Sequence, residues 1–239
     1  MNDYKVKIHH EVLDWKRKLL RKSSYFNRIS RSVQTKVNQY IPEKAHMVMT
    51  SAIKNMVEAI LKGSNYITKK NQANEFQTLA EKDAKVVEKL AIYRKTAMLE
   101  GAGTGAGGFL LGLADFPLLL SIKIKFLFEM ASVYGFDTNK YEERIFILQI
   151  FHLAFSSEKK RNEIIDTIEN WESEKKKLVQ MDWREFQQEY RDYIDLIKMF
   201  QLVPGVGAMV GAYANYRFLD HLGETAMNCY RLRLLTAAP

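Results

Sequence analysis

The stretch EGAGTGAGGFLLGLADFP, residues 100–117, has a composition unlike the rest of the chain. Six of the 12 glycines in the protein lie between positions 101 and 112, and Asp115 is the one charged residue among residues 101–117. A second stretch, VPGVGAMVGAYANY at residues 203–216, carries no charge. Neither stretch is amphipathic enough to lie on a water-facing surface. We therefore expect both to be helical, to be buried in the core, and to contact each other.

The glycine spacing has two interpretations that the residues leave open. Pairs such as Gly101 and Gly105, or Gly207 and Gly211, are four positions apart, and small residues at that spacing let two helix backbones approach closely. The alternative is a hinge or loop. The residues we expect to bind a ligand or partner are the small and polar members of both stretches: Gly101, Gly103, Gly105, Gly107, Gly108, Gly112, Asp115, Pro117, Pro204, Gly205, Gly207, Gly211 and Asn215.

On both sides of these two stretches, apolar residues recur at helical spacing, and the sequence shows no hairpin signals. Helices are predicted on the stripe of residues 8–19 and over about residues 26–41, 43–62, 73–99, 117–134, 158–178 and 182–202. One further helix includes residues 145–151, and a final helix ends near residue 235. Gly63 and Gly135 are placed to end two of them, and Pro117 suits a first turn behind an Asp115 N-cap. Asp137 or Thr138 is predicted to cap the helix containing residues 145–151, which must be buried because it is apolar nearly all round.

The predicted fold is all-α: a single-domain, multi-helix bundle over residues 1–239, with basic N-terminal helices in 1–40 and the core in 41–239. Its length is within what one hydrophobic core supports. The single cysteine, Cys229, fits a reducing compartment, and the N-terminus lacks a signal-peptide pattern. We therefore expect a cytoplasmic protein.

The net charge of +8 is concentrated at the N-terminus. Residues 1–40 hold ten Lys or Arg and three acids, a local charge of +7, which predicts an anionic partner. An apolar stripe of Ile8, Val12, Trp15 and Leu19 on the same helix suits a protein interface or a bilayer surface. The residues predicted to bind an anionic surface are Lys16, Arg17, Lys18, Arg21 and Lys22.

No cofactor, metal or catalytic residue is predicted. Residues 103–108 match the letters G-x-G-x-x-G, but a dinucleotide site needs a preceding strand, and residues 89–99 have a helical pattern. His9 and His10 would need further ligands to hold a metal ion. The sequence contains no G-x-S-x-G and no H-E-x-x-H.

Three blocks of sequence resemble the EcsC family: residues 100–120, then YGFD at 134–137 with Glu143 and Arg144, and residues 203–216. Their order and spacing match, and the resemblance extends over essentially the whole chain. It implies a single fold and a link with membrane processes, because the family takes its name from an operon that also encodes an ABC transporter. It implies no catalytic residues.

Three functions follow as expectations. The first is a non-enzymatic protein that docks peripherally on the inner face of the membrane, on anionic lipid or on a membrane protein such as an ABC transporter. The second is an enzyme or binding protein for a lipid or other apolar ligand, with a pocket near Asp115 and Asn215. The third, nucleic-acid binding through residues 1–40, has no recognised motif to support it, and we do not expect it.

Overall fold

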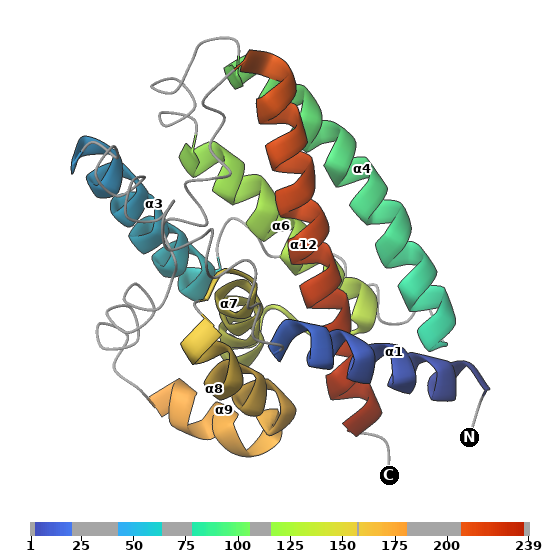
Figure 1. Ribbon diagram of the computed structural model, residues 1–239. Helices are drawn as coiled ribbons and strands as arrows, with labels where there is room; N and C mark the ends of the chain where they lie inside the picture. Colours follow the sequence, from blue (N-terminus) through green and yellow to red (C-terminus); the bar gives the residue numbers. More distant parts are fainter. Residues whose placement is uncertain are drawn as a thin grey trace.

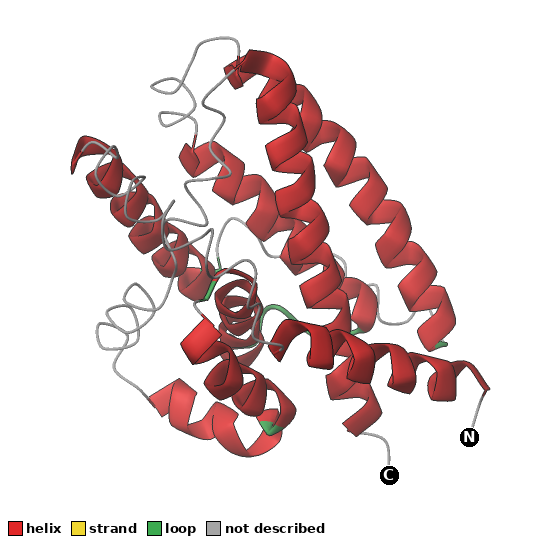
Figure 2. Cartoon of the chain, viewed as in Figure 1, coloured by secondary structure: helices red, strands yellow, loops and turns green. Residues whose placement is uncertain are grey.

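The computed structural model describes residues 3–20, 43–63, 78–105, 116–156, 158–180 and 207–236, and within these ranges the regular elements are all helices (Figures 1 and 2). The predicted all-α bundle is confirmed. The helices expected over residues 26–41 and 182–202 lie outside the described residues. The described helices are α1 (Asp3–Leu20), α3 (Glu43–Lys62), α4 (Leu79–Gly105), α6 (Phe116–Tyr134), α7 (Tyr141–Phe155), α8 (Glu158–Glu169), α9 (Trp171–Gln180) and α12 (Gly207–Thr236).

Helix α7 forms the centre of the core, as its composition predicts. Every residue from Ile145 to Phe155 is buried, and α3, α6, α8, α9 and α12 all pack against this helix. A helix that is apolar on all sides has no face suited to water, so neighbours must cover it completely.

Two predicted helix ends are confirmed. Gly63 has a φ of 74° and its N–H donates to the Ala59 carbonyl at 2.9 Å. Gly135 has a φ of 99°, and the N–H of Phe136 donates to the Ala131 carbonyl at 2.9 Å, which closes the last turn of α6. Glycine is favoured at both positions because a side chain would be strained at these positive φ angles.

Three predicted boundaries are wrong. Helix α4 begins at Leu79 and not near residue 73, because the backbone N–H groups of Thr78 and Glu81 each donate to the other residue's side-chain oxygen and cap the helix. It also continues through Gly101 and Gly103 to Gly105. The predicted helix over residues 158–178 is interrupted by a turn at Asn170, after which the buried ring of Trp171 packs on Phe146.

The cap predicted for α7 is the fourth correction. Its N-cap residue is Lys140, which makes no side-chain capping bond. Asp137 instead accepts hydrogen bonds from the backbone N–H and the side-chain amide of Asn139, at 3.0 and 2.7 Å. These bonds lower the pKa of the Asp137 carboxyl and stabilise the turn before the helix.

The helices define two ends of the bundle. Helices α4 and α12 run antiparallel along most of their length, so the end of α4 meets the start of α12. The starts of α3 and α6 point the same way, at the top of Figure 1, and we name this the glycine end. The opposite end, named the α1 end, contains α1, α8, α9 and the last turns of α12 (Figure 1).

Candidate functional site

The glycine end contains those predicted ligand- or partner-binding residues that the structure describes. Gly101, Gly103 and Gly105 lie in the last turns of α4, and Gly207, Gly211 and Asn215 lie in the first turns of α12. Pro117 lies in the first turn of α6 and is exposed. Outside the described residues are Gly107, Gly108, Gly112, Asp115, Pro204 and Gly205, and with them the proposed pocket near Asp115 and Asn215. The assignment of these residues to a site therefore remains a prediction.

The pairing of α4 with α12 is fixed by contacts in the middle of both helices. A Cβ atom on Gly223 would lie 2.8 Å from Leu90 Cδ1, so the Leu90 side chain of α4 lies directly against the backbone of α12 there. One turn further along α4, Arg94 forms an ion pair with Asp220, and its guanidinium lies 5.1 Å from the centre of the Tyr216 ring. The same antiparallel register, continued toward the glycine end, brings residues 101–105 level with the first two turns of α12.

Large apolar side chains are exposed at the glycine end. On α4, Leu99 is 77% exposed; on α6, Leu118 is 58% exposed; and on α3, Met47 is 59% exposed. Met98 and Val48 are exposed beside them. Isolated exposed apolar residues are ordinary, but a group of them at one end of a bundle marks a surface that contacts something apolar.

At the α1 end, the predicted interfacial stripe is buried in the protein's own core. Ile8 and Val12 are each 1% exposed, and Trp15 and Leu19 are buried with them, since α1 packs on α8 and α12. The interpretation of this stripe as a bilayer-facing surface is therefore wrong. A helical stripe of this kind is equally suited to a protein core and to a membrane, and the local sequence does not distinguish them.

The basic side chains of α1 are partly neutralised by acids. Lys16 contacts both carboxylate oxygens of Glu169 on α8, at 2.6 and 2.7 Å, and Arg17 pairs with Asp14 at 2.6 Å. Lys18 is exposed, whereas Arg21 and Lys22 lie outside the described residues. Beside these cations is an open depression of about 580 Å³, whose described lining consists of Leu13, Lys16, Arg17 and Leu20. The role of α1 in binding an anionic surface remains a prediction.

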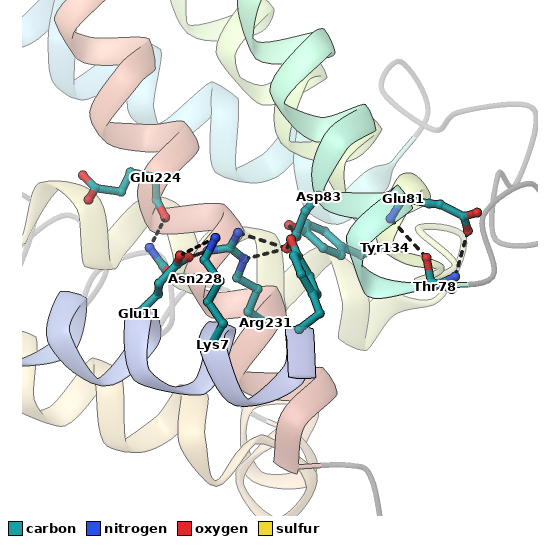
Figure 3. A network of polar contacts seen from close by, with 10 residues as sticks. Lys7, Glu11, Thr78, Glu81, Asp83, Tyr134, Glu224, Asn228 and Arg231 are labelled. Atoms are coloured by element: carbon teal, nitrogen blue, oxygen red, sulfur yellow. Dashed lines mark hydrogen bonds and ion pairs between the residues drawn. The ribbon is translucent and has the colours of Figure 1, made fainter. Parts of the chain in front are cut away.

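A buried polar network joins α1 to the bundle, and Figure 3 shows most of it. Asp83 on α4 is 3% exposed; it accepts hydrogen bonds from Tyr4 at 2.8 Å and from Tyr134 at 2.7 Å. Arg231 on α12 pairs with the same carboxylate at 3.0 Å and reaches Glu11 of α1 at 3.2 Å. The network thus connects four helices.

The chemistry of this network favours a structural role. Burial and the hydrogen bond to Asp83 raise the pKa of Tyr4 to about 12, and burial with the nearby Asp83 charge raises that of Tyr134 well above its usual range. Both phenols therefore stay protonated near neutral pH and donate to Asp83. Burial alone would lower the pKa of Arg231, but Asp83 more than compensates and raises it. Each charge in the network is paired, so the arrangement holds helices together.

A second buried ion pair lies close to α7. Arg233 of α12 contacts both carboxylate oxygens of Glu143 at 2.5 and 2.7 Å. Its guanidinium also stacks 4.2 Å from the ring centre of Phe136 and 4.8 Å from that of Phe146. A bidentate, stacked arginine is a rigid structural contact. The sequence alone could not identify Glu143 as half of an ion pair, because its partner is 90 positions away.

Two further observations limit the chemistry of the described part. Among the described residues, no group of three or more His, Cys, Asp or Glu could hold a metal ion. Of the helices described, none is long and apolar enough to cross a membrane. The two buried ion-pair clusters above are structural, and five of the nine large apolar side chains exposed among the described residues lie at the glycine end.

These features define a class: an all-helical bundle stabilised by buried ion pairs, with an apolar, glycine-rich end. The sequence profile of the EcsC protein family matches residues 6–235, and the chain belongs to this family. It is 55% identical to Protein EcsC of Bacillus subtilis (strain 168) over 228 residues, 95% of each chain.

A second relative is more distant. The chain is 33% identical to the uncharacterized protein YdbA of the same organism over 141 residues, which is 57% of this chain and 52% of that protein. No solved structure matches the chain.

Proposed function

We propose that this protein is a non-enzymatic, peripheral membrane protein that docks on the inner face of the cell membrane through its glycine end. The observation that carries this proposal is the group of exposed apolar side chains, chiefly Leu99, Leu118 and Met47, on three helices that each have one end at the glycine end. A soluble surface gains nothing from apolar groups at such exposure, whereas a bilayer interface removes them from water.

The described helices suit a protein that docks on the membrane surface and does not span the bilayer. Apolar side chains at the ends of helices can enter the outer part of the acyl layer while the rest of the bundle stays in water, as amphipathic anchors do to a depth of about 5–10 Å. A membrane protein, such as the ABC transporter to which the family resemblance points, is the second candidate partner at the same end.

Membrane fractionation tests the proposal. Cells that express the full chain are lysed, and the membranes are washed with high salt and with alkaline carbonate. We expect the protein in the membrane fraction and its release by carbonate. Recovery wholly in the soluble fraction, or retention after carbonate, would contradict peripheral docking.

A further inference from the structure

Each of the three helices that expose apolar residues at the glycine end also carries an exposed lysine. Lys95 precedes Leu99 by four positions on α4, Lys125 follows Leu118 by seven on α6, and Lys54 follows Met47 by seven on α3; all three are exposed. Residues four or seven positions apart share one face of a helix. Each lysine therefore lies below an apolar residue on the same face, on the side away from the glycine end. We name these lysines the lysine collar.

The spacing matches the layers of a bilayer leaflet. At a rise of 1.5 Å per residue, the collar Cα atoms lie about 6–10 Å below those of the apolar residues. The headgroup region of one leaflet is about 5–8 Å thick, so apolar tips in the acyl layer would place the ammonium groups among the headgroups. Lysine suits this position because its stem can extend along apolar surface while its charge stays in water.

Charge distinguishes the collar from the basic helix α1. Within the described residues, no acid forms an ion pair with Lys95 or Lys125, whereas Lys16 and Arg17 of α1 both have acidic partners. Lys95 and Lys125 therefore present positive charge that no described acid pairs, although α1 belongs to the more basic stretch of sequence. Anionic headgroups complement such a surface, because cations close to an anionic membrane are attracted to it.

Resting on the membrane docking proposed above, we infer that the lysine collar binds anionic lipid headgroups and holds the bundle upright, with the apolar residues of the glycine end inserted and the α1 end facing away. The occupant of this surface is thus an anionic phospholipid bilayer. Because α1 packs on the last turns of α12, about 35 Å along that helix from its start, α1 does not touch the same membrane in this orientation.

Vesicle binding by the full-length chain tests the inference. The probes are vesicles of phosphatidylcholine and vesicles in which part of that lipid is replaced by phosphatidylglycerol. We expect K95Q/K125Q to weaken binding to the anionic vesicles about 25-fold, at roughly fivefold per lysine. The matched control R17Q/K18Q removes the same charge from α1 and should change binding less than about twofold. L99Q/L118Q should weaken binding to both kinds of vesicle.

A fluorescent label reports the orientation directly. The native Cys229 is fully buried, and burial raises the pKa of its thiol, so the folded protein labels selectively at an added exposed cysteine. An environment-sensitive dye on Leu118→Cys should shift to the blue when anionic vesicles are added. The same dye on Val179→Cys, exposed on α9 at the α1 end, should not shift.

The outcomes separate this inference from the proposed function. If the wild type binds anionic vesicles, but R17Q/K18Q abolishes binding and K95Q/K125Q does not, the collar is wrong and membrane docking stands. If the wild type binds native membranes only until these are treated with trypsin, and binds no protein-free vesicle, the receptor is a protein and the lipid inference is wrong. If it binds neither membranes nor vesicles, the proposed function itself fails.

Discussion

The two ends of this bundle satisfy their side chains in opposite ways. At the α1 end, buried charges find partners inside the protein: Asp83 with Arg231, and Glu143 with Arg233. At the glycine end, large apolar side chains such as Leu99 and Leu118 remain in water. The α1 end therefore supplies internal cohesion, while the glycine end keeps a surface available for a partner. Substitutions of the paired residues at the first should change folding stability, and those of the exposed apolar residues at the second should change binding alone.

The largest effect on stability is expected for Arg233→Met, which tests the internally paired end. The substitution leaves the buried Glu143 carboxylate without its bidentate partner, and breaking a buried pair in this way costs about 3–5 kcal/mol. Urea unfolding followed by circular dichroism measures the loss. Arg17→Met is the control, since its pair with Asp14 is exposed and such pairs contribute about 0–1 kcal/mol.

The double variant Arg233→Met/Glu143→Met distinguishes loss of a pair from loss of packing. With both charges removed, no carboxylate is left buried alone, and much of the stability should return. If Arg233→Met cost no more than Arg17→Met, the contrast drawn between the ends would not hold.

A smaller effect is expected for Gly223→Leu, in the middle of the α4–α12 pair. A Cβ at this position would lie 2.8 Å from Leu90 Cδ1, so a leucine side chain should overpack the contact and destabilise by about 1–3 kcal/mol. Gly223→Ala should be milder, because alanine's better helix propensity offsets up to about 1 kcal/mol. Thermal unfolding of both variants provides the measurement.

The same substitution at Gly207 extends the test to the glycine end. If close backbone approach continues along the pair, Gly207→Leu should also destabilise by about 1–3 kcal/mol, with Gly207→Ala much milder. A cost at Gly223 without one at Gly207 would show that close approach ends before the glycine end. Some other property, such as contact with a ligand, would then be needed to explain its glycines.

A pH-dependent effect is expected from His152, buried in α7 between the two ends. Burial first, and the charge of Lys160 second, lower the pKa of this imidazole from 6.5 to about 4. Between pH 6.5 and pH 4, the unfolded chain therefore binds a proton on this imidazole that the folded chain does not. The contribution of His152 to the free energy of unfolding is complete above pH 6.5 and is lost as the pH falls toward 4. The slope contributed by this group approaches about 1.4 kcal/mol per pH unit.

Comparing unfolding at pH 7 and pH 5 for the wild type and His152→Gln isolates that contribution. The variant should lack this part of the decline with pH. An identical pH dependence in the two proteins would mean that other groups control acid stability.

How well the sequence predicted the structure depended on how local the signal was. The ends of α3 and α6 were predicted because Gly63 and Gly135 act on their own turns. The capping pair Thr78 and Glu81 is equally local, and its Thr-x-x-Glu pattern is present in the sequence. The start of α4 was nevertheless predicted about six residues too early, because this pattern was not used.

Long-range features could not be predicted in this way. Arg231 pairs with Asp83 across 148 positions, and nothing near either residue indicates its partner. The stripe on α1 was correctly placed on one helical face, but whether it meets a core or a membrane depends on the other helices. The lysine collar could not be predicted for the same reason, since it depends on how α3, α4 and α6 are packed relative to one another.

The smallest effect on stability is expected at the glycine end itself, and it gives the sharpest test of the comparison. Leu118 is 58% exposed, whereas Leu120, two positions later on α6, is 2% exposed and belongs to the core. Leu118→Ala should change the free energy of unfolding by no more than about 0.5 kcal/mol, because the side chain has little contact area to lose. Leu120→Ala should cost about 2–5 kcal/mol, since it leaves a cavity among packed neighbours. The two variants share one helix and the same change in side-chain volume, so burial is the main difference between them. Urea unfolding of the pair measures the contrast, and vesicle binding should show the reverse order wherever Leu120→Ala remains folded. A large stability cost for Leu118→Ala would mean that Leu118 is covered by the protein itself, and the apolar surface proposed to enter the membrane would lose one of its three main members.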